Sequence, residues 1–202
     1  MAYLYVYVSD GLSADGEIYP SLRRKIIKET VNEKLKKQRT QVWALLKTAV
    51  ENSLGLKFET LNFSLAGNGK WSADKFFFSL SHTEGFVAVA VSSAPTGIDV
   101  EDTLRFSGEG KEKLLKRIAA DGEEDKDVCA LWTQKESIFK CGRDGIFKPK
   151  EIKAENYPVT TFTAGRYMLS VCGENVESAN YCFLKDGKII NCKVKDGNIA
   201  PV

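Results

Sequence analysis

Two carboxylates spaced two residues apart are the first feature of the sequence that can support catalysis. Asp99 and Glu101 lie in the short β-branched run TGIDVE at residues 96–101. Side chains alternate between the two faces of a strand, so both carboxylates point to one side while Ile98 and Val100 point into the core. Their like charges repel unless water, a basic side chain or a divalent cation lies between them, and a few oxygen ligands suit Mg²⁺ bound together with substrate phosphates. An exposed polar strand face is the alternative interpretation.

A helix predicted over residues 127–141 carries further charged side chains. Glu136 lies one turn after Trp132, and Lys140 lies one turn further, so both can face a cleft. The alternative is an ordinary i,i+4 pair that contributes roughly 0.2–0.5 kcal/mol. Lys135 falls within the apolar stripe of this helix, where a cation needs an anionic partner or a route to water.

His82, the single histidine of the chain, lies between Ser81 and Thr83 at the head of a predicted strand. Hydroxyls and backbone N–H groups can gather round an anion there, although a structural histidine is the alternative. A single histidine excludes a zinc site that needs two imidazoles. Without a G-x-S-x-G turn, the sequence also argues against a serine hydrolase.

Positive charge is concentrated in residues 21–50, which carry nine Lys and Arg against two Glu, whereas the whole chain has a net charge of +2. Such a segment suits nucleic acid, an acidic protein or a phosphorylated small molecule, or it forms a solvated helix face. No zinc-finger or RNP pattern accompanies it, so we do not expect a nucleic-acid partner.

The elements that position these residues alternate between strands and helices. A strand is predicted at residues 2–8, a helix with apolar residues from Val42 to Leu54 that stops at Gly55, and a buried strand pair from SLSHTEG into FVAVAVSS. A short helix follows at 111–120, and Asp186-Gly187 predicts a tight hairpin.

The two halves of the chain resemble each other loosely. Trp43 begins a helix that is followed by FVAVAVSS, and Trp132 begins a helix that is followed by YMLSVCGE. We therefore predict an α+β fold of two similar halves related by a pseudo-twofold axis, with the active-site cleft between them. The halves are residues 1–95 and residues 96–202, and the second carries the carboxylates.

The composition is that of an ordinary globular chain, with 202 residues, 43% hydrophobic and 28% charged. No stretch reaches the roughly 18 apolar residues of a membrane span, and the opening residues lack the features of a secretory leader, so we expect a cytoplasmic protein without a membrane partner. The five cysteines form no C-x-x-C pair and are expected to be reduced and buried.

Four segments, taken in order over residues 39–142, resemble the 4′-phosphopantetheinyl transferase superfamily. They are Gly69-Lys70, FSLSH at 78–82, GIDVE at 97–101 and WTQKESIFK at 132–140, and Arg39-Thr40 resembles the family's N-terminal Arg-Thr pair. Trp71 and Ser79 stand where the family usually has Pro and Asn. The chain length resembles the monomeric, two-lobed type that activates peptide and polyketide synthases.

This resemblance implies transfer of 4′-phosphopantetheine from coenzyme A to a serine of an apo acyl, peptidyl or polyketide carrier protein, with release of 3′,5′-ADP. It implies Mg²⁺, or Mn²⁺ in its place, held by Asp99, Glu101 and Glu136. Glu136 would be the catalytic base, and Lys140 would neutralise the leaving group. The residues expected to contact coenzyme A are Arg39, Thr40, Lys70, Ser81, His82, Lys135 and Lys140.

Carrier proteins are acidic around the modified serine, so a docking surface with cations and apolar residues is expected. The segment from Lys111 to Arg117 offers both, although an ordinary amphipathic surface helix is the alternative. Two other functions use the same residues: a metal-dependent phosphohydrolase, and a non-catalytic module that binds coenzyme A or another nucleotide.

Overall fold

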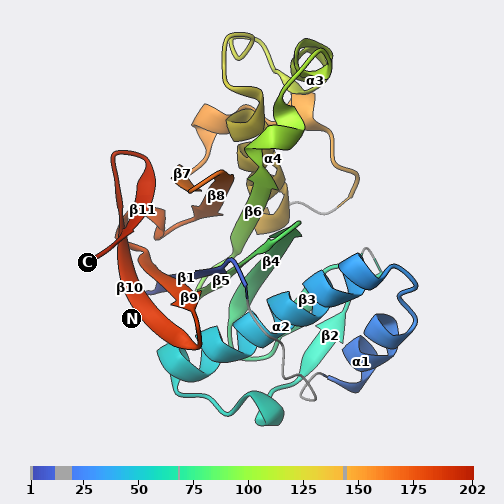
Figure 1. The fold of residues 1–202 in the computed structure, drawn as a ribbon, viewed down its shortest axis with the longest axis vertical. Coiled ribbons are helices and arrows are strands. Elements are labelled where there is room, and N and C mark those ends of the chain that lie inside the picture. The colour runs from blue at the N-terminus through green and yellow to red at the C-terminus, as the bar shows by residue number, and fades with distance from the viewer. Residues whose placement is uncertain (1, 12–19, 68, 143–144) are drawn as a thin grey trace.

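A computed structural model describes residues 2–11, 20–67, 69–142 and 145–202 (Figure 1). The helices are α1 (Ser21–Lys28), α2 (Glu33–Leu54), α3 (Gly110–Ile118) and α4 (Val128–Gly142). The strands of the large sheet are β1 (Leu4–Ser9), β4 (Phe77–Thr83), β5 (Phe86–Ser92), β6 (Thr96–Asp102), β7 (Val159–Ala164), β8 (Tyr167–Gly173), β9 (Asn180–Lys185), β10 (Lys188–Lys195) and β11 (Asn198–Pro201). A separate hairpin joins β2 (Phe63–Leu65) to β3 (Trp71–Ala73).

The large sheet has the strand order β4-β5-β1-β9-β10-β11-β7-β8-β6 in the described part of the chain. Helix α2 packs on β1, β4 and β5, and α4 packs on β6, β7 and β8. The predicted α+β class is confirmed, whereas the pseudo-twofold relation between the halves stays a prediction. The sheet also crosses the boundary predicted between residues 95 and 96, because β1 pairs with β5 on one side and with β9 on the other.

The two end strands of this sheet, β4 and β6, lie against each other. Serine hydroxyls of β4, rather than a backbone ladder, bridge the contact. Ser79 Oγ accepts a hydrogen bond from the Ile98 N–H at 3.0 Å, and Ser81 Oγ accepts one from the Val100 N–H at 3.2 Å. We call this contact the seam, and it brings residues from the two halves of the chain side by side.

Helix α2 forms where the apolar spacing predicts it but begins nine residues earlier than Val42. The side chain of Asn32 caps its first turn by accepting from the Leu35 N–H at 3.0 Å, and Gly55 ends it with a φ of +64°. Its C-terminal half buries apolar side chains, among them Trp43, while the basic N-terminal half stays largely at the surface. The basic residues in the N-terminal half of α2 therefore lie mainly on the surface of the helix.

Helix α4 approaches β6 closely because β6 carries a glycine. A Cβ atom built on Gly97 would lie 1.9 Å from the Ser137 carbonyl oxygen and 2.6 Å from the Cys141 nitrogen. The helix begins after Asp127, whose Oδ1 accepts from the Cys129 and Ala130 N–H groups at 3.0 and 2.9 Å. No larger residue fits at position 97 without moving the helix.

The predicted hairpin at Asp186-Gly187 is also confirmed. The hairpin between β9 and β10 turns at Asp186 and Gly187, with φ values of +49° and +73°, as a tight turn of this kind requires. All five cysteines are free; four are buried, and Cys141 is partly exposed. None of the helices in the described residues is long and apolar enough to cross a membrane. Asn68, part of the glycine-rich turn before β3, lies outside the described residues.

The close contact at Gly97 predicts a large loss of stability on substitution. Gly97→Ala should lower the free energy of unfolding by about 3 kcal/mol, because a methyl group would overlap backbone atoms of α4. Gly110→Ala is the matched control, since nothing lies within 4 Å of its added Cβ. Urea denaturation of both variants measures the difference, and equal midpoints would contradict the packing described here.

Candidate active site

The acidic face of β6 lies in a cavity of about 250 Å³ beside the seam. Asp99 and Glu101 both line it, as the strand alternation predicts, and Glu136 and Lys140 line it from α4. The remaining lining residues are Leu80, Ser81, His82, Val100 and Trp132. We call this cavity the acidic pocket.

Asp99 is the most buried carboxylate of the acidic pocket, at 5% exposure. Its Oδ1 accepts hydrogen bonds from Lys140 Nζ at 2.6 Å and from Ser81 Oγ at 2.8 Å. Its Oδ2 is buried and has no hydrogen-bond partner among the residues that the structure describes. A buried carboxylate oxygen without a partner is unfavourable, so this atom is suited to accept a further donor or a cation.

The other two carboxylates have pKa values above the usual range for Glu. Burial, followed by the negative charge of Asp99, raises the pKa of Glu101 to about 7, although Arg105 and Lys140 oppose the shift. Burial also raises the pKa of Glu136, and Asp99 adds to the effect while Lys140 opposes it. The environment of the pocket therefore disfavours the ionised form of both glutamates.

Two cations of the chain are paired with these carboxylates. Lys140 is paired with Asp99, and Arg105 Nη1 lies 2.5 Å from Glu101 Oε2. Among the described residues, no group of three or more His, Cys, Asp or Glu side chains is arranged to hold a metal ion. Asp99, Glu101 and Glu136 are thus neighbours in one pocket without forming a closed ligand set.

His82 lies where positive charges of several elements converge. Burial, followed by the charges of Lys140, Arg39 and Arg23, lowers the pKa of His82 to about 4. Arg39 Nη1 also donates to Thr30 Oγ1 at 2.8 Å, and the Thr40 hydroxyl donates to the Lys36 carbonyl oxygen within α2 at 2.9 Å. This corner of the pocket is electropositive and suited to an anion.

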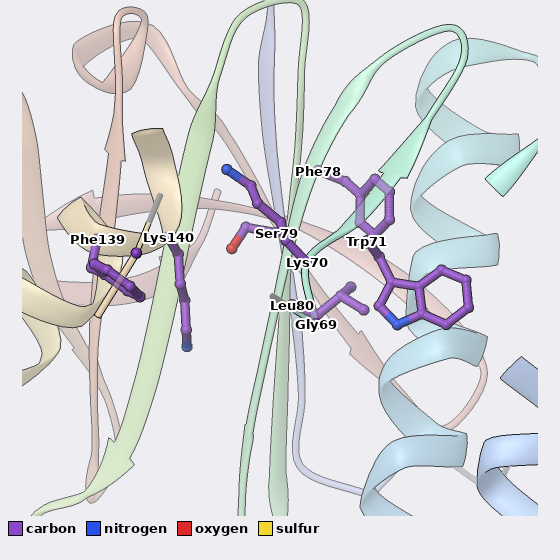
Figure 2. Close-up of a pocket in the computed structure, with 9 residues that line it drawn as sticks. Gly69, Lys70, Trp71, Phe78, Ser79, Leu80, Phe139 and Lys140 are labelled. Carbon is purple, nitrogen blue, oxygen red and sulfur yellow. The ribbon is translucent and has the colours of Figure 1, made fainter. Parts of the chain in front are cut away.

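A second cavity, of about 260 Å³, adjoins the acidic pocket, because Leu80 and Lys140 line both. Figure 2 shows Phe139 and Lys140 on one side of it, Phe78 and Trp71 on the other, and Lys70 near the middle. The remaining lining residues are Gly69, Ser79 and Gly145. We call this cavity the aromatic pocket.

Two residues that depart from the family pattern have clear roles in this structure. Trp71 lines the aromatic pocket and packs on Trp43 with ring centroids 5.0 Å apart. Ser79 also lines this pocket and bonds the backbone of β6 at the seam. Both departures therefore lie at the junction between β4 and its neighbours.

Lys135 lies outside both pockets, contrary to the expectation that it contacts coenzyme A. It is fully buried, and its ammonium group lies 2.5 Å from Glu123 Oε2. It also donates to the carbonyl oxygens of Ile118 at 2.8 Å and Pro149 at 3.0 Å. The expected anionic partner exists, but it is a residue of this chain, so we leave Lys135 out of the proposed coenzyme A site.

The segment predicted to dock a carrier protein is α3. Lys111, Lys113, Lys116 and Arg117 are exposed, whereas Leu114 and Leu115 are half-buried against the core. Lys111 lies 3.8 Å from the carboxylate of Asp127. The surface of α3 is thus basic, and its leucines contribute mainly to packing against the protein.

Several residues of the site were not predicted from the sequence. Arg105, which pairs with Glu101, and Phe139, which lines the aromatic pocket, carry no pattern that distinguishes them from other surface or core residues. Glu123 lies in a charged, glycine-punctuated segment that predicts only a loop. Their roles depend on contacts between distant parts of the chain.

Buried carboxylates facing an electropositive corner and an apolar cavity are chemically suited to a phosphorylated ligand. Comparison with known proteins agrees with this class. Residues 95–189 match the sequence model of the 4′-phosphopantetheinyl transferase superfamily. The 4′-phosphopantetheinyl transferase psf-1 of Bacillus pumilus is 29% identical over 132 residues, which cover 59% of this chain and 52% of that protein.

The family model thus covers residues 95–189, and over this segment it confirms the resemblance inferred from the motifs. The chain spans about half the length of the curated relative that it matches. The matched segment contains β6 and α4, which carry Asp99, Glu101, Glu136 and Lys140.

The environment of His82 predicts an unusual titration. The pKa of His82 is about 4 in the folded chain and about 6.5 in the unfolded chain. Between these two pH values the unfolded chain therefore binds more protons than the folded chain. The free energy of unfolding should fall as the pH is lowered from 6.5 to 4. NMR titration of the single histidine should give a midpoint far below 6.5. In His82→Gln, the free energy of unfolding measured by urea denaturation should decline less between pH 6.5 and pH 4 than in the wild type. A folded-state midpoint near 6.5 would contradict the electropositive corner.

Proposed function

We propose that this chain transfers the 4′-phosphopantetheine group of coenzyme A to a serine of an apo carrier protein and releases 3′,5′-ADP. The observation that supports this most directly is the meeting of two motifs from separate elements. Asp99 and Glu101 of β6 face the same pocket as Glu136 and Lys140 of α4. We further propose that the protein acts as a monomer on carriers of fatty acid, polyketide or nonribosomal peptide synthesis.

The chemistry of the carboxylates in the acidic pocket, rather than a preformed ligand set, suits a divalent cation. Asp99 Oδ2 is a buried oxygen without a partner, and the pKa values of Glu101 and Glu136 are raised by burial and by nearby negative charge. Oxygen donors of this kind suit Mg²⁺ or Mn²⁺. When bound, the cation would neutralise charge on the pyrophosphate of coenzyme A.

The cations around the two pockets would hold the remaining phosphate charge. His82, Arg39 and Lys140 lie close enough for the two cations to lower the pKa of the imidazole, and Lys70 lines the adjoining cavity. An incoming phosphate would accept a hydrogen bond from the imidazole N–H, and also from the Ser81 hydroxyl if that hydroxyl turned away from Asp99. Lys140, which lines both pockets, would neutralise the 3′,5′-ADP as it leaves.

Glu136 is the base that we propose for the attacking serine. A serine hydroxyl is neutral at pH 7 and must lose its proton in the transition state. The carboxylate of Glu136 would accept this proton directly or through one water. Burial raises the pKa of Glu136 above the usual value for a glutamate, which makes its carboxylate a stronger base than an exposed one.

The aromatic pocket would receive the nucleotide end of coenzyme A. Its walls are aromatic on both sides, and Lys70 and Lys140 add positive charge to its lining. A purine ring stacks well between such side chains, while the lysines suit the attached phosphates. Trp71 and Phe139 are the side chains that we expect to contact the base.

The role of Glu136 gives the first test of the proposed function. Glu136→Gln should lower kcat by about 100-fold or more, because the amide cannot accept the serine proton. Intact-protein mass spectrometry of apo acyl and peptidyl carrier proteins, incubated with coenzyme A and Mg²⁺, measures the mass gain of the carrier. Circular dichroism checks that the variant folds.

Glu177→Gln, at an exposed position away from both pockets, is the matched control and should transfer at the wild-type rate. Turnover like the wild type in Glu136→Gln would reject the proposed base. Release of 3′,5′-ADP without any carrier would instead indicate a phosphohydrolase. Binding of coenzyme A with neither product would indicate a binding module.

We also propose that the basic surface of α3 docks the carrier protein. The double variant Lys113→Glu/Lys116→Glu should raise the KM for the carrier about tenfold, because it replaces attraction with repulsion, and leave the KM for coenzyme A unchanged. Lys188→Glu/Lys193→Glu, an equal charge change on the exposed side chains of β10, is the control. Equal effects of both variants on the carrier KM would count against docking at α3.

A further inference from the structure

The buried ion pair between Lys135 and Glu123 has no part in the proposed chemistry. The two side chains are 0% and 1% exposed, and Lys135 Nζ lies 2.5 Å from Glu123 Oε2. Lys135 directly precedes the proposed base Glu136 on α4, yet its side chain points away from the acidic pocket toward the end of α3.

Each end of this pair is bonded to the backbone of other segments. Lys135 Nζ donates to the carbonyl of Ile118, the last residue of α3, and to the carbonyl of Pro149. Glu123 Oε2 accepts from the Ala120 N–H at 2.9 Å, and Oε1 accepts from the Ala154 N–H at 3.0 Å. The pair therefore joins α4 to the end of α3, to the turn after it and to residues 149–154.

A buried ion pair of this kind contributes little net stability compared with apolar residues of the same size, because both charges must be desolvated. Its directional bonds can instead fix one relative position of the segments that it joins. Apolar packing between α3 and α4 alone, through half-buried Leu114 and Leu115, has no comparable directionality. The bonds of the pair thus define where α3 lies on α4.

We infer that Lys135 is a positioning residue which, with Glu123, holds α3 in the orientation that the carrier protein requires, without affecting coenzyme A. This inference rests on the proposed function, and on α3 as the carrier-facing helix. Helix α3 lies at the top of the view in Figure 1, whereas α2, which carries Arg39, runs across its lower half. Displacement of α3 should therefore change carrier binding and leave the coenzyme A side intact.

The test uses Lys135→Met and the double variant Lys135→Met/Glu123→Gln in the full chain. The single variant leaves a buried carboxylate without its partner, so the double variant, which removes both charges, keeps the test valid if the single one does not fold. In the double variant, the KM for an apo carrier should rise at least fivefold. The kcat and the KM for coenzyme A should stay within twofold of the wild-type values.

Hydrogen exchange measured by mass spectrometry provides a readout independent of activity. Amides of residues 110–123 should exchange faster in the double variant, whereas those of α2 should not change. Lys148→Met is the matched control, because it removes an exposed ion pair with Glu151 from the same region, and it should change neither exchange nor KM.

The outcomes separate this inference from the proposed function. An unchanged carrier KM in the folded double variant, or equal rises in both KM values, would overturn the positioning role while transfer by the wild type stands. A wild-type protein that modifies no carrier would overturn the proposed function and this inference with it.

Discussion

The seam between β4 and β6 is the contact on which the rest of the site depends. Two serine hydroxyls of β4 accept the Ile98 and Val100 N–H groups, and one of them also donates to Asp99. The seam thereby places His82, from the first half of the chain, beside the carboxylates of the second. Because side chains rather than a backbone ladder make this contact, polar side chains of both strands line one cavity.

Helix α4 completes the site because one helix presents different side chains in different directions. Glu136 and Lys140, four residues apart, share the face toward the acidic pocket, while Lys135, about 100° away, points to α3. The close approach at Gly97 fixes the distance of this helix from β6. The proposed catalytic role of Glu136 and the proposed positioning role of Lys135 therefore fall on adjacent residues of the same motif.

Local patterns predicted the parts of the fold that local physics determines. The alternation along β6, the length of α4 and the turn at Asp186-Gly187 follow from side-chain period and backbone conformation alone. The pairing of β1 with β9, and the contact between the end strands of the sheet, join residues far apart in the chain, and no local pattern encodes them. For the same reason the sequence indicated that Lys135 needs an anionic partner but did not identify Glu123.

Helix α4 contributes to two charged clusters, the Lys135–Glu123 pair and the acidic pocket. They differ in how many of their charged and hydrogen-bonding groups have partners within the protein. The pair of Lys135 and Glu123 is neutral overall, and backbone groups complete its hydrogen bonds. The acidic pocket has an unpartnered oxygen on Asp99, and burial raises the pKa values of two glutamates there. A fold tolerates such uncompensated charge where a ligand supplies the missing partner, and it removes it elsewhere. We therefore expect the unsatisfied cluster to bind the ligand and the satisfied cluster to hold the helix in place.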